Sequence, residues 1–269
     1  MRHPAAALLL ALVLGVVPPG APAPHAQPAS TEPAASEPAA SRPAGTCAAP
    51  PEAMSAAPLP GVFAAVARGD LRIMVVGSAS TTLGGTSSAA ATWPRRLQER
   101  LSSRLQGVSV RVEVFGGRGT TAADHARIIM REAPRLRPHL VIWQLGTVEA
   151  ARGLPAEEMS DAVQEAAARL TATRGELTDL VLMDPQFSRF FRANANVEPY
   201  LDQLRIAAAA SGAQLFSRWA LMKHWVDIER LDLERAPRDS RSAVADELHA
   251  CIAGVLTAFI LDGIARDDR

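Results

Sequence analysis

Short β-branched and aliphatic runs alternate along the chain with longer segments of helical spacing, and this alternation constrains the fold most strongly. The runs that predict strands are Leu71 to Val76, Val108 to Phe115, Leu140 to Gln144, Asp179 to Met183 and Gln214 to Phe216. The segments that predict helices are Trp93 to Leu105, Thr121 to Ala133, Ala156 to Arg174, Pro199 to Ala210 and Ser242 to Ile264. We therefore expect an α/β three-layer sandwich, a five-stranded parallel sheet with right-handed crossovers and helices on both faces.

The N-terminal part of the chain does not share this pattern. Residues 1–26 contain Arg2, an apolar run from Ala5 to Val17 and a small-residue stretch at Ala21 to Ala23, the form of a secretory signal peptide. The apolar run is shorter than the roughly 20 residues that span a bilayer, although an uncleaved anchor is an alternative. Residues 27–60, rich in Pro, Ala and Ser, predict a disordered linker, so the folded domain should cover 61–269. We expect an exported protein, periplasmic or secreted, with no stable membrane span after cleavage.

The charge balance argues against one class of binding partner, and the two cysteines allow a disulfide. The chain carries 28 basic and 28 acidic residues, which removes the electrostatic basis for binding nucleic acid. Scattered Asp, Glu and His residues show no metal-ligand spacing, and no cofactor is implied. Cys47 and Cys251 can form a disulfide in an exported compartment, or Cys251 can be an ordinary buried residue and Cys47 a free thiol; sequence alone favours neither.

Three segments place chemistry where the carboxyl ends of the strands should meet. The first strand is followed by a small-residue turn from Gly77 to Gly84 that contains Ser80, and the second by a glycine-rich turn from Gly116 to Thr121. In either segment the small and hydroxyl residues can serve only to form the turn or to cap the next helix. Backbone N–H groups in the second turn can also bind an oxyanion. In the last helical segment Asp246 precedes His249 by three residues, a spacing at which a carboxylate can orient an imidazole. The alternative is a surface Asp and His on one helix face.

Taken together and in this order, the segments resemble the SGNH hydrolases, also called the GDSL esterase and lipase family, over residues 70 to 265. The family carries Gly-Asp-Ser-x-Thr-x-Gly, Gly-x-Thr, Gly-x-Asn-Asp and Asp-x-x-His blocks. Here the last block is Asp246 and His249, and the second is Gly119 and Thr121. The resemblance implies the flavodoxin-like SGNH fold and a Ser-His-Asp mechanism on small acyl esters, acetyl esters among them.

The first block fits in two registers. If Gly77 and Thr81 match the family, Ala79 takes the nucleophile position and no nucleophile remains. If Ser80 is the nucleophile, Thr82 and Gly84 fall at the family spacing, and we prefer this register because it keeps three positions, including the reactive one.

The third block departs from the family, because Val148 stands where the family has the asparagine that donates to the oxyanion. A valine cannot donate, so the backbone N–H groups of Ser80 and Gly119 are the expected oxyanion hole, a weakened one. We predict an ester hydrolase in which Asp246 orients His249, and His249 takes the proton of Ser80. The alternatives are a binding protein that kept the fold and lost the reaction, and an acyltransferase acting on extracytoplasmic glycans.

Overall fold

The computed structural model describes residues 47–171 and 177–267. The strands are β1 (Asp70–Gly77), β2 (Ser109–Gly116), β3 (Leu140–Gln144), β4 (Asp179–Met183) and β5 (Gln214–Phe216). All pairings are parallel, in the order β2-β1-β3-β4-β5. The predicted sheet is confirmed, and the bounds of β3, β4 and β5 agree with the expected ones.

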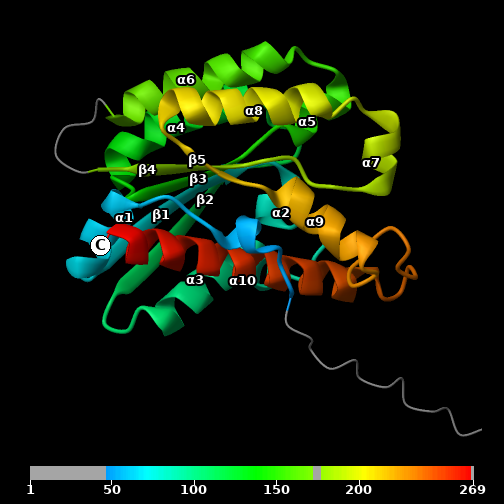
Figure 1. Ribbon diagram of the computed structural model, residues 1–269, viewed down its shortest axis with the longest axis horizontal. Helices are drawn as coiled ribbons and strands as arrows, with labels where there is room; N and C mark the ends of the chain where they lie inside the picture. Colours follow the sequence, from blue (N-terminus) through cyan, green and yellow to red (C-terminus); the bar gives the residue numbers. More distant parts are fainter. Residues whose placement is uncertain (1–46, 172–176, 268–269) are drawn as a thin grey trace, which may run out of the picture. The chain divides into compact units, whose positions relative to one another are not determined.

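Helices cover both faces of the sheet (Figure 1). The helices of the described residues are α1 (Pro60–Ala67), α2 (Ala79–Thr82), α3 (Trp93–Arg104), α4 (Ala122–Leu136), α5 (Thr147–Arg152), α6 (Ala156–Thr171), α7 (Arg189–Asn194), α8 (Glu198–Ser211), α9 (Arg218–Asp227) and α10 (Arg241–Asp267), with short 3-10 turns at Pro51–Met54 and Ala89–Ala91. Helices α4, α6 and α8 lie on one face, whereas α1, α3 and α10 lie on the other. The three-layer α/β sandwich is therefore confirmed.

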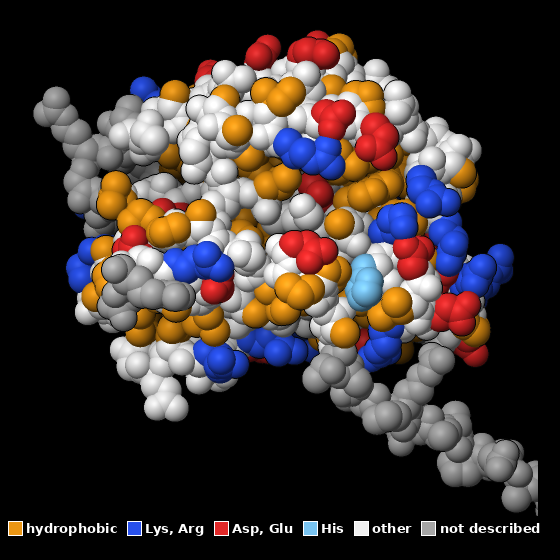
Figure 2. All heavy atoms as spheres, in the orientation of Figure 1, with side chains coloured by type: hydrophobic (Ala, Val, Ile, Leu, Met, Phe, Trp, Pro, Cys, Tyr) orange, Lys and Arg blue, Asp and Glu red, His pale blue; other side chains and the backbone are white. Residues whose placement is uncertain are grey.

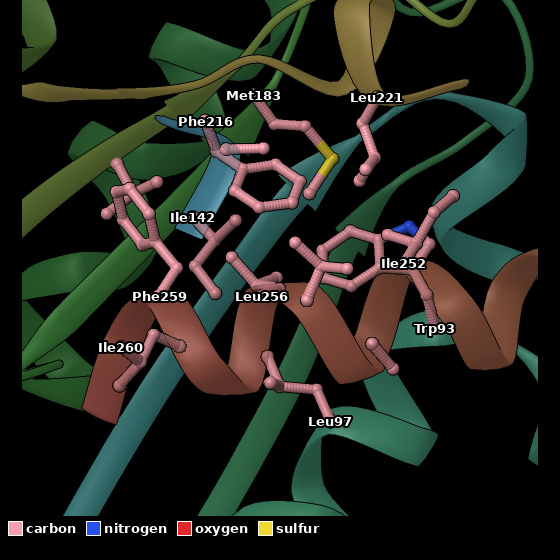
Figure 3. Packing of buried hydrophobic residues seen from close by; sticks show 14 of the residues in the cluster. Trp93, Leu97, Ile142, Met183, Phe216, Leu221, Ile252, Leu256, Phe259 and Ile260 are labelled. Atoms are coloured by element: carbon pink, nitrogen blue, oxygen red, sulfur yellow. The ribbon is translucent and has the colours of Figure 1, made fainter. Parts of the chain in front are cut away.

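Strand β3 shows why the central strands read as unbroken apolar runs. Its side chains alternate between the two layers: Leu140 and Ile142 pack with the α3 and α10 side, and Val141 and Trp143 with the α4, α6 and α8 side. A strand that is buried on both faces has no polar face to reveal its period of two. In Figure 3, Ile142 of β3 faces Leu256 of α10.

Helix α10 is the longest helix of the described residues, with 27 residues, and it alone among them is long and apolar enough to meet the requirement for a membrane span. Its apolar residues nevertheless face the sheet, where Ile252, Leu256, Phe259 and Ile260 are each no more than 3% exposed (Figure 3). A long buried core helix satisfies the same requirement. Its first half carries His249, so one helix serves both the core and the candidate site.

The packed part of the chain begins near Cys47, earlier than the boundary expected at residue 61. Ala53, Ala56 and Leu59 are buried against the α10 side of the sheet, and Cys47 forms a disulfide with Cys251. Composition concealed this because three small or aliphatic side chains among prolines are enough to anchor a short segment. The bond spans 204 residues, and loss of a native disulfide typically costs about 2–5 kcal/mol in small exported domains. Residues 1–46, which include the predicted signal peptide and most of the predicted linker, lie outside the described residues.

Candidate functional site

Ser80 lies on the short helix α2, which begins two residues after β1. The turn needs a small residue at its start, since a Cβ on Gly77 would lie 2.5 Å from Cγ2 of Thr81 and 3.0 Å from Cβ of Gln144. The turn therefore brings Ser80 to the carboxyl edge of the sheet, directly beside the end of β3.

The hydroxyl of Ser80 has two polar partners. It donates a hydrogen bond to Oε1 of Gln144 at 2.8 Å and accepts one from Nη1 of Arg218 at 3.2 Å. Because a serine hydroxyl has a single proton, that proton points toward Gln144 in this arrangement.

His249 lies on α10, is 4% exposed and lines the same pocket as Ser80. A Cβ placed on Gly84 would lie 2.8 Å from Cα of Ser80 and 3.1 Å from Nε2 of His249. Gly84 has a φ of +56°, in the left-handed region that favours glycine. The absence of a side chain at position 84 thus leaves space between the serine and the imidazole.

The tautomer of His249 follows from its backbone contact. Nδ1 accepts a hydrogen bond from the backbone N–H of Trp93 at 3.0 Å, so the single proton of the neutral ring sits on Nε2. Burial, together with the nearby cation of Arg218, lowers the pKa of His249 to about 4. The ring is therefore neutral at pH 7 and presents an N–H group from Nε2.

Asp246 lies one turn before His249, and its carboxylate contacts a different element. Oδ1 accepts the backbone N–H of Ser87 at 2.8 Å, and Oδ2 accepts the Ser87 hydroxyl at 2.5 Å. Burial acts to raise the pKa of Asp246, but these hydrogen bonds outweigh it and the pKa is lowered overall. In this arrangement Asp246 holds the loop before α3, and its predicted role as the partner of the imidazole stays a prediction.

Ser80, Gly84 and His249 line one pocket, with a cavity volume of about 120 Å³. The remaining wall comes from the loop after β4, from α9, from the α9–α10 loop and from α10. Its apolar members are Phe187, Met222, Val226, Leu231, Leu233, Ala245 and Leu248. Polar side chains also line the pocket, namely Gln186, Ser188, Asp232 and Glu234. A concave wall that combines apolar residues with a few polar groups is the usual form of a small-molecule site.

The α9–α10 loop is pinned over this pocket from its outer side. The carboxylate of Asp232 pairs with Nε of Arg189 at 3.0 Å, and Glu234 accepts the backbone N–H groups of Arg189 and Phe190 at the start of α7. These contacts attach the α9–α10 loop, with Leu231 and Leu233, to the start of α7. The apolar wall of the pocket is therefore held in place by polar contacts between the loop and α7.

The second predicted loop forms a helix cap. Thr121 and Asp124 make a capping box at the start of α4, and Glu149 accepts the backbone N–H groups of Ala122 and Gly146. Gly119 has a φ of +78° and lies beside Arg152, and it is not among the residues that line the pocket. The helix-cap interpretation is confirmed for Thr121, whereas an oxyanion role for the Gly119 N–H stays a prediction.

Two residues that contact Ser80 carried weak signals in the sequence. The first is Gln144, which ends an otherwise apolar strand, a position from which its side chain reaches the sheet edge. Val148 on α5, by contrast, offers no side-chain donor. Arg218 follows the shortest strand, β5, and the loop after that strand is also at the carboxyl edge. An arginine in a loop is usually exposed, which is why composition gave no reason to single it out.

No cluster of three or more His, Cys, Asp or Glu side chains that could hold a metal ion is found within residues 47–171 and 177–267. On the face shown in Figure 2, basic and acidic side chains are interspersed and form no large field of one sign. This agrees with the balanced composition of the chain.

Comparisons with known proteins place this site in context. Residues 46–266 match the non-GDSL lipase-like family. No curated protein matches the sequence. Among solved structures, the α/β hydrolase enzyme LAE5 from the metagenome of Lake Arreo, Spain, is 18% identical with a TM-score of 0.54, covering 70% of this chain and 94% of that chain.

Two further structures are similar at the level of the fold. A catalytic variant of Axe2, an acetylxylan esterase from Geobacillus stearothermophilus, is 14% identical with a TM-score of 0.52, covering 70% of this chain and 94% of that one. A lipase/acylhydrolase from Enterococcus faecalis is 13% identical with a TM-score of 0.50, covering 68% and 96%. Since the family match extends over most of the sequence, the chain belongs to the non-GDSL lipase-like family.

Proposed function

We propose that the protein is an exported serine ester hydrolase that acts on small acyl esters, acetyl esters among them, with Ser80 as nucleophile and His249 as base. The observation that carries the proposal is that Ser80 and His249 line one apolar pocket at the carboxyl edge of the sheet. Membership of a lipase-like family, and a fold shared with an acetylxylan esterase and a lipase/acylhydrolase, support the same reaction class.

The reaction requires His249 to change the state seen in this structure. Nε2 can take the proton of Ser80 only when the ring proton is on Nδ1, and Nδ1–H needs an acceptor in place of the Trp93 N–H. Asp246, one helical turn away, supplies a carboxylate once it leaves Ser87. We infer that substrate binding accompanies this exchange, after which Ser80 forms an acyl-enzyme that water hydrolyses.

The pocket supports an ester whose acyl or alcohol part is apolar or small. Leu231, Leu233 and Leu248 give this pocket apolar surface against which such a group can pack. An acyl ester on a glycan fits the same chemistry if only the acyl group enters the pocket.

Two features support export. The N-terminal residues have the form of a signal peptide, and the disulfide between Cys47 and Cys251 is typical of an oxidising compartment. Both point to the periplasm or the extracellular medium.

A second candidate is a binding protein that retains the fold without turnover. The specific observation in its favour concerns two hydrogen bonds: the backbone N–H of Trp93 donates to Nδ1 of His249, and that of Ser87 donates to the carboxylate of Asp246. In this structure the three side chains of a Ser-His-Asp triad are therefore not linked by hydrogen bonds. Val148 in the expected oxyanion position agrees with this alternative.

Labelling of the full-length protein with a fluorophosphonate, followed by peptide mapping, separates the two candidates. A hydrolase should be labelled at Ser80, and labelling should vanish in Ser80→Ala but persist in the control Ser103→Ala, an exposed serine on α3. A folded protein that resists labelling and releases no alcohol from p-nitrophenyl acetate would contradict the hydrolase proposal and leave the binding protein.

A further inference from the structure

A buried arginine stands at the junction of four loops at the carboxyl edge of the sheet. Arg218, the first residue of α9, is 1% exposed. Its Nη1 donates to Oγ of Ser80 at 3.2 Å, its Nη2 to Oγ1 of Thr147 at 3.5 Å, and its Nε to the backbone carbonyl of Asp184 at 3.2 Å. The guanidinium thus joins the loops after β1, β3 and β4 to the loop after β5.

The charge of this arginine has no ion-pair partner among the described residues. The buried carboxyl group of Asp184 interacts electrostatically with Arg218, but burial has the larger effect and raises the pKa of Asp184 to about 7; its Oδ1 accepts the backbone N–H of Trp219 at 2.7 Å. Burial also lowers the pKa of Arg218 to about 10, a value at which the side chain is still a cation at neutral pH. Burial of an arginine with no carboxylate in hydrogen-bond contact is unfavourable, and a buried cation beside the candidate nucleophile is a candidate for a functional charge.

Arg218 supplies a hydrogen-bond donor beside Ser80, where the side chain of Val148 supplies none. Val148 removes the asparagine donor expected beside the nucleophile, whereas Arg218 places an N–H group within hydrogen-bond distance of the reactive oxygen. A guanidinium has five N–H donors, and the contacts above take three of them. Two N–H donors therefore remain outside these contacts; the guanidinium does not itself line the pocket and reaches it at Ser80.

We propose that Arg218 stabilises the negative charge that forms on the ester carbonyl oxygen when Ser80 attacks, in place of the missing asparagine; this inference rests on the proposed hydrolase function. Oγ of Ser80 bonds to the carbonyl carbon, the π pair of the carbonyl moves onto its oxygen, and the serine proton passes to Nε2 of His249. When the intermediate collapses, the C–O bond to the alcohol breaks and the alcohol leaves with that proton. Arg218 donates hydrogen bonds throughout and stays protonated.

The test measures hydrolysis of p-nitrophenyl acetate by the full-length protein and by Arg218→Gln. Loss of one oxyanion donor typically costs about 100- to 1000-fold in kcat, and we expect a loss of that order with KM changed only a few-fold. The matched control is Arg111→Gln, which removes an exposed arginine on β2, far along the strand from the site. Its kcat should equal that of the unaltered protein.

Two further variants distinguish a catalytic role from a structural one. Arg218→Ala should regain activity when guanidinium chloride is added at low millimolar concentration, and an absence of rescue in a folded protein would count against the proposal. If Arg218→Gln does not fold, Arg218→Lys keeps the charge without the planar fork and should still lose at least about tenfold in kcat; unchanged kcat in that variant would overturn the proposal.

The outcomes also separate this inference from the function on which it rests. If Ser80→Ala abolishes hydrolysis while folded Arg218→Gln retains it, the hydrolase stands and the role of Arg218 is wrong. If Ser80→Ala retains full hydrolysis, the nucleophile assignment and the role of Arg218 both fail.

Discussion

His125 on α4 and His249 on α10 begin from the same local chemistry and end in different environments. Both rings are buried, both accept at Nδ1 an N–H group that belongs to a tryptophan, and burial lowers the pKa of both to about 4. The donor is the indole of Trp143 for His125 and the backbone of Trp93 for His249. In both cases the neutral ring therefore carries its proton on Nε2.

The two rings differ in the surroundings of Nε2. Nε2 of His125 meets Oγ1 of Thr120 at 2.8 Å, so the ring is closed on both sides and serves the packing of α4. Nε2 of His249 faces the space beside Gly84 in the pocket that Ser80 lines. Equal burial and equal pKa shifts thus do not distinguish the two histidines, whereas an open nitrogen in a pocket makes His249 the candidate base.

Replacement of His249 should have the largest effect. We expect His249→Gln, which keeps an acceptor for the Trp93 N–H, to lower kcat for p-nitrophenyl acetate by about 10²- to 10⁴-fold, the usual contribution of a general base. Steady-state kinetics checks the loss, and thermal unfolding checks that the fold persists. Turnover within threefold of the unaltered protein would break the proposed distinction between the two histidines.

The reverse pattern is expected for His125. His125→Leu leaves the indole N–H of Trp143 buried without an acceptor, which should cost about 1–3 kcal/mol of unfolding free energy. The kcat should stay within a few-fold. Urea unfolding followed by tryptophan fluorescence measures the cost, and His125→Gln, which retains an acceptor, is the control with the smaller loss.

Acid should weaken the fold through both rings. Each folded-state pKa lies below the value of about 6.5 expected in the unfolded chain, so the unfolded state binds more protons as the pH falls. Stability is therefore lost between about pH 6.5 and 4. Asp184, whose raised pKa acts in the opposite direction, makes the difference between the unaltered protein and each variant the informative quantity.

Urea unfolding at pH 7 and pH 5 measures this difference. The loss of stability between the two pH values should be smaller in His125→Leu and in His249→Gln than in the unaltered protein. A loss that is equal in all three proteins would mean that neither ring is held neutral by the fold.

The smallest effect is expected at Ser87. Ser87→Ala removes the hydroxyl that donates to Oδ2 of Asp246, while the backbone N–H contact to Oδ1 remains. The carboxylate should then reach Nδ1 of His249 more often, and kcat should rise a few-fold. Nitrogen-15 chemical shifts of the ring report the same change, and an unaltered tautomer with unaltered kcat would show that Ser87 does not restrain Asp246.

The sheet could be predicted from the sequence because its central strands are continuous apolar runs between helical segments. Helices α5 and α7 were missed, since each has only six residues and so short a segment shows no helical stripe. The early boundary near Cys47 was missed because the segment is held by a few buried small or aliphatic side chains and by a disulfide that the sequence left open.

The site was predictable in part. Local motifs led to Ser80 and His249, since each lies in a segment with a recognisable spacing, and both line the pocket. The contacts of Arg218 and Gln144 with Ser80 join α2, the end of β3 and the start of α9, and could not be predicted from any one segment. Nor could spacing show that Asp246 bonds to Ser87, because this depends on where the loop before α3 returns.

The bond between Cys47 and Cys251 encloses all five strands in one covalent ring. A protease that cuts a single loop between the two cysteines therefore opens the ring without releasing a fragment. The nicked protein would migrate as one species on a non-reducing gel and separate into two pieces only after reduction. In a compartment where proteases are present, such a molecule can keep its sheet assembled after the backbone is broken.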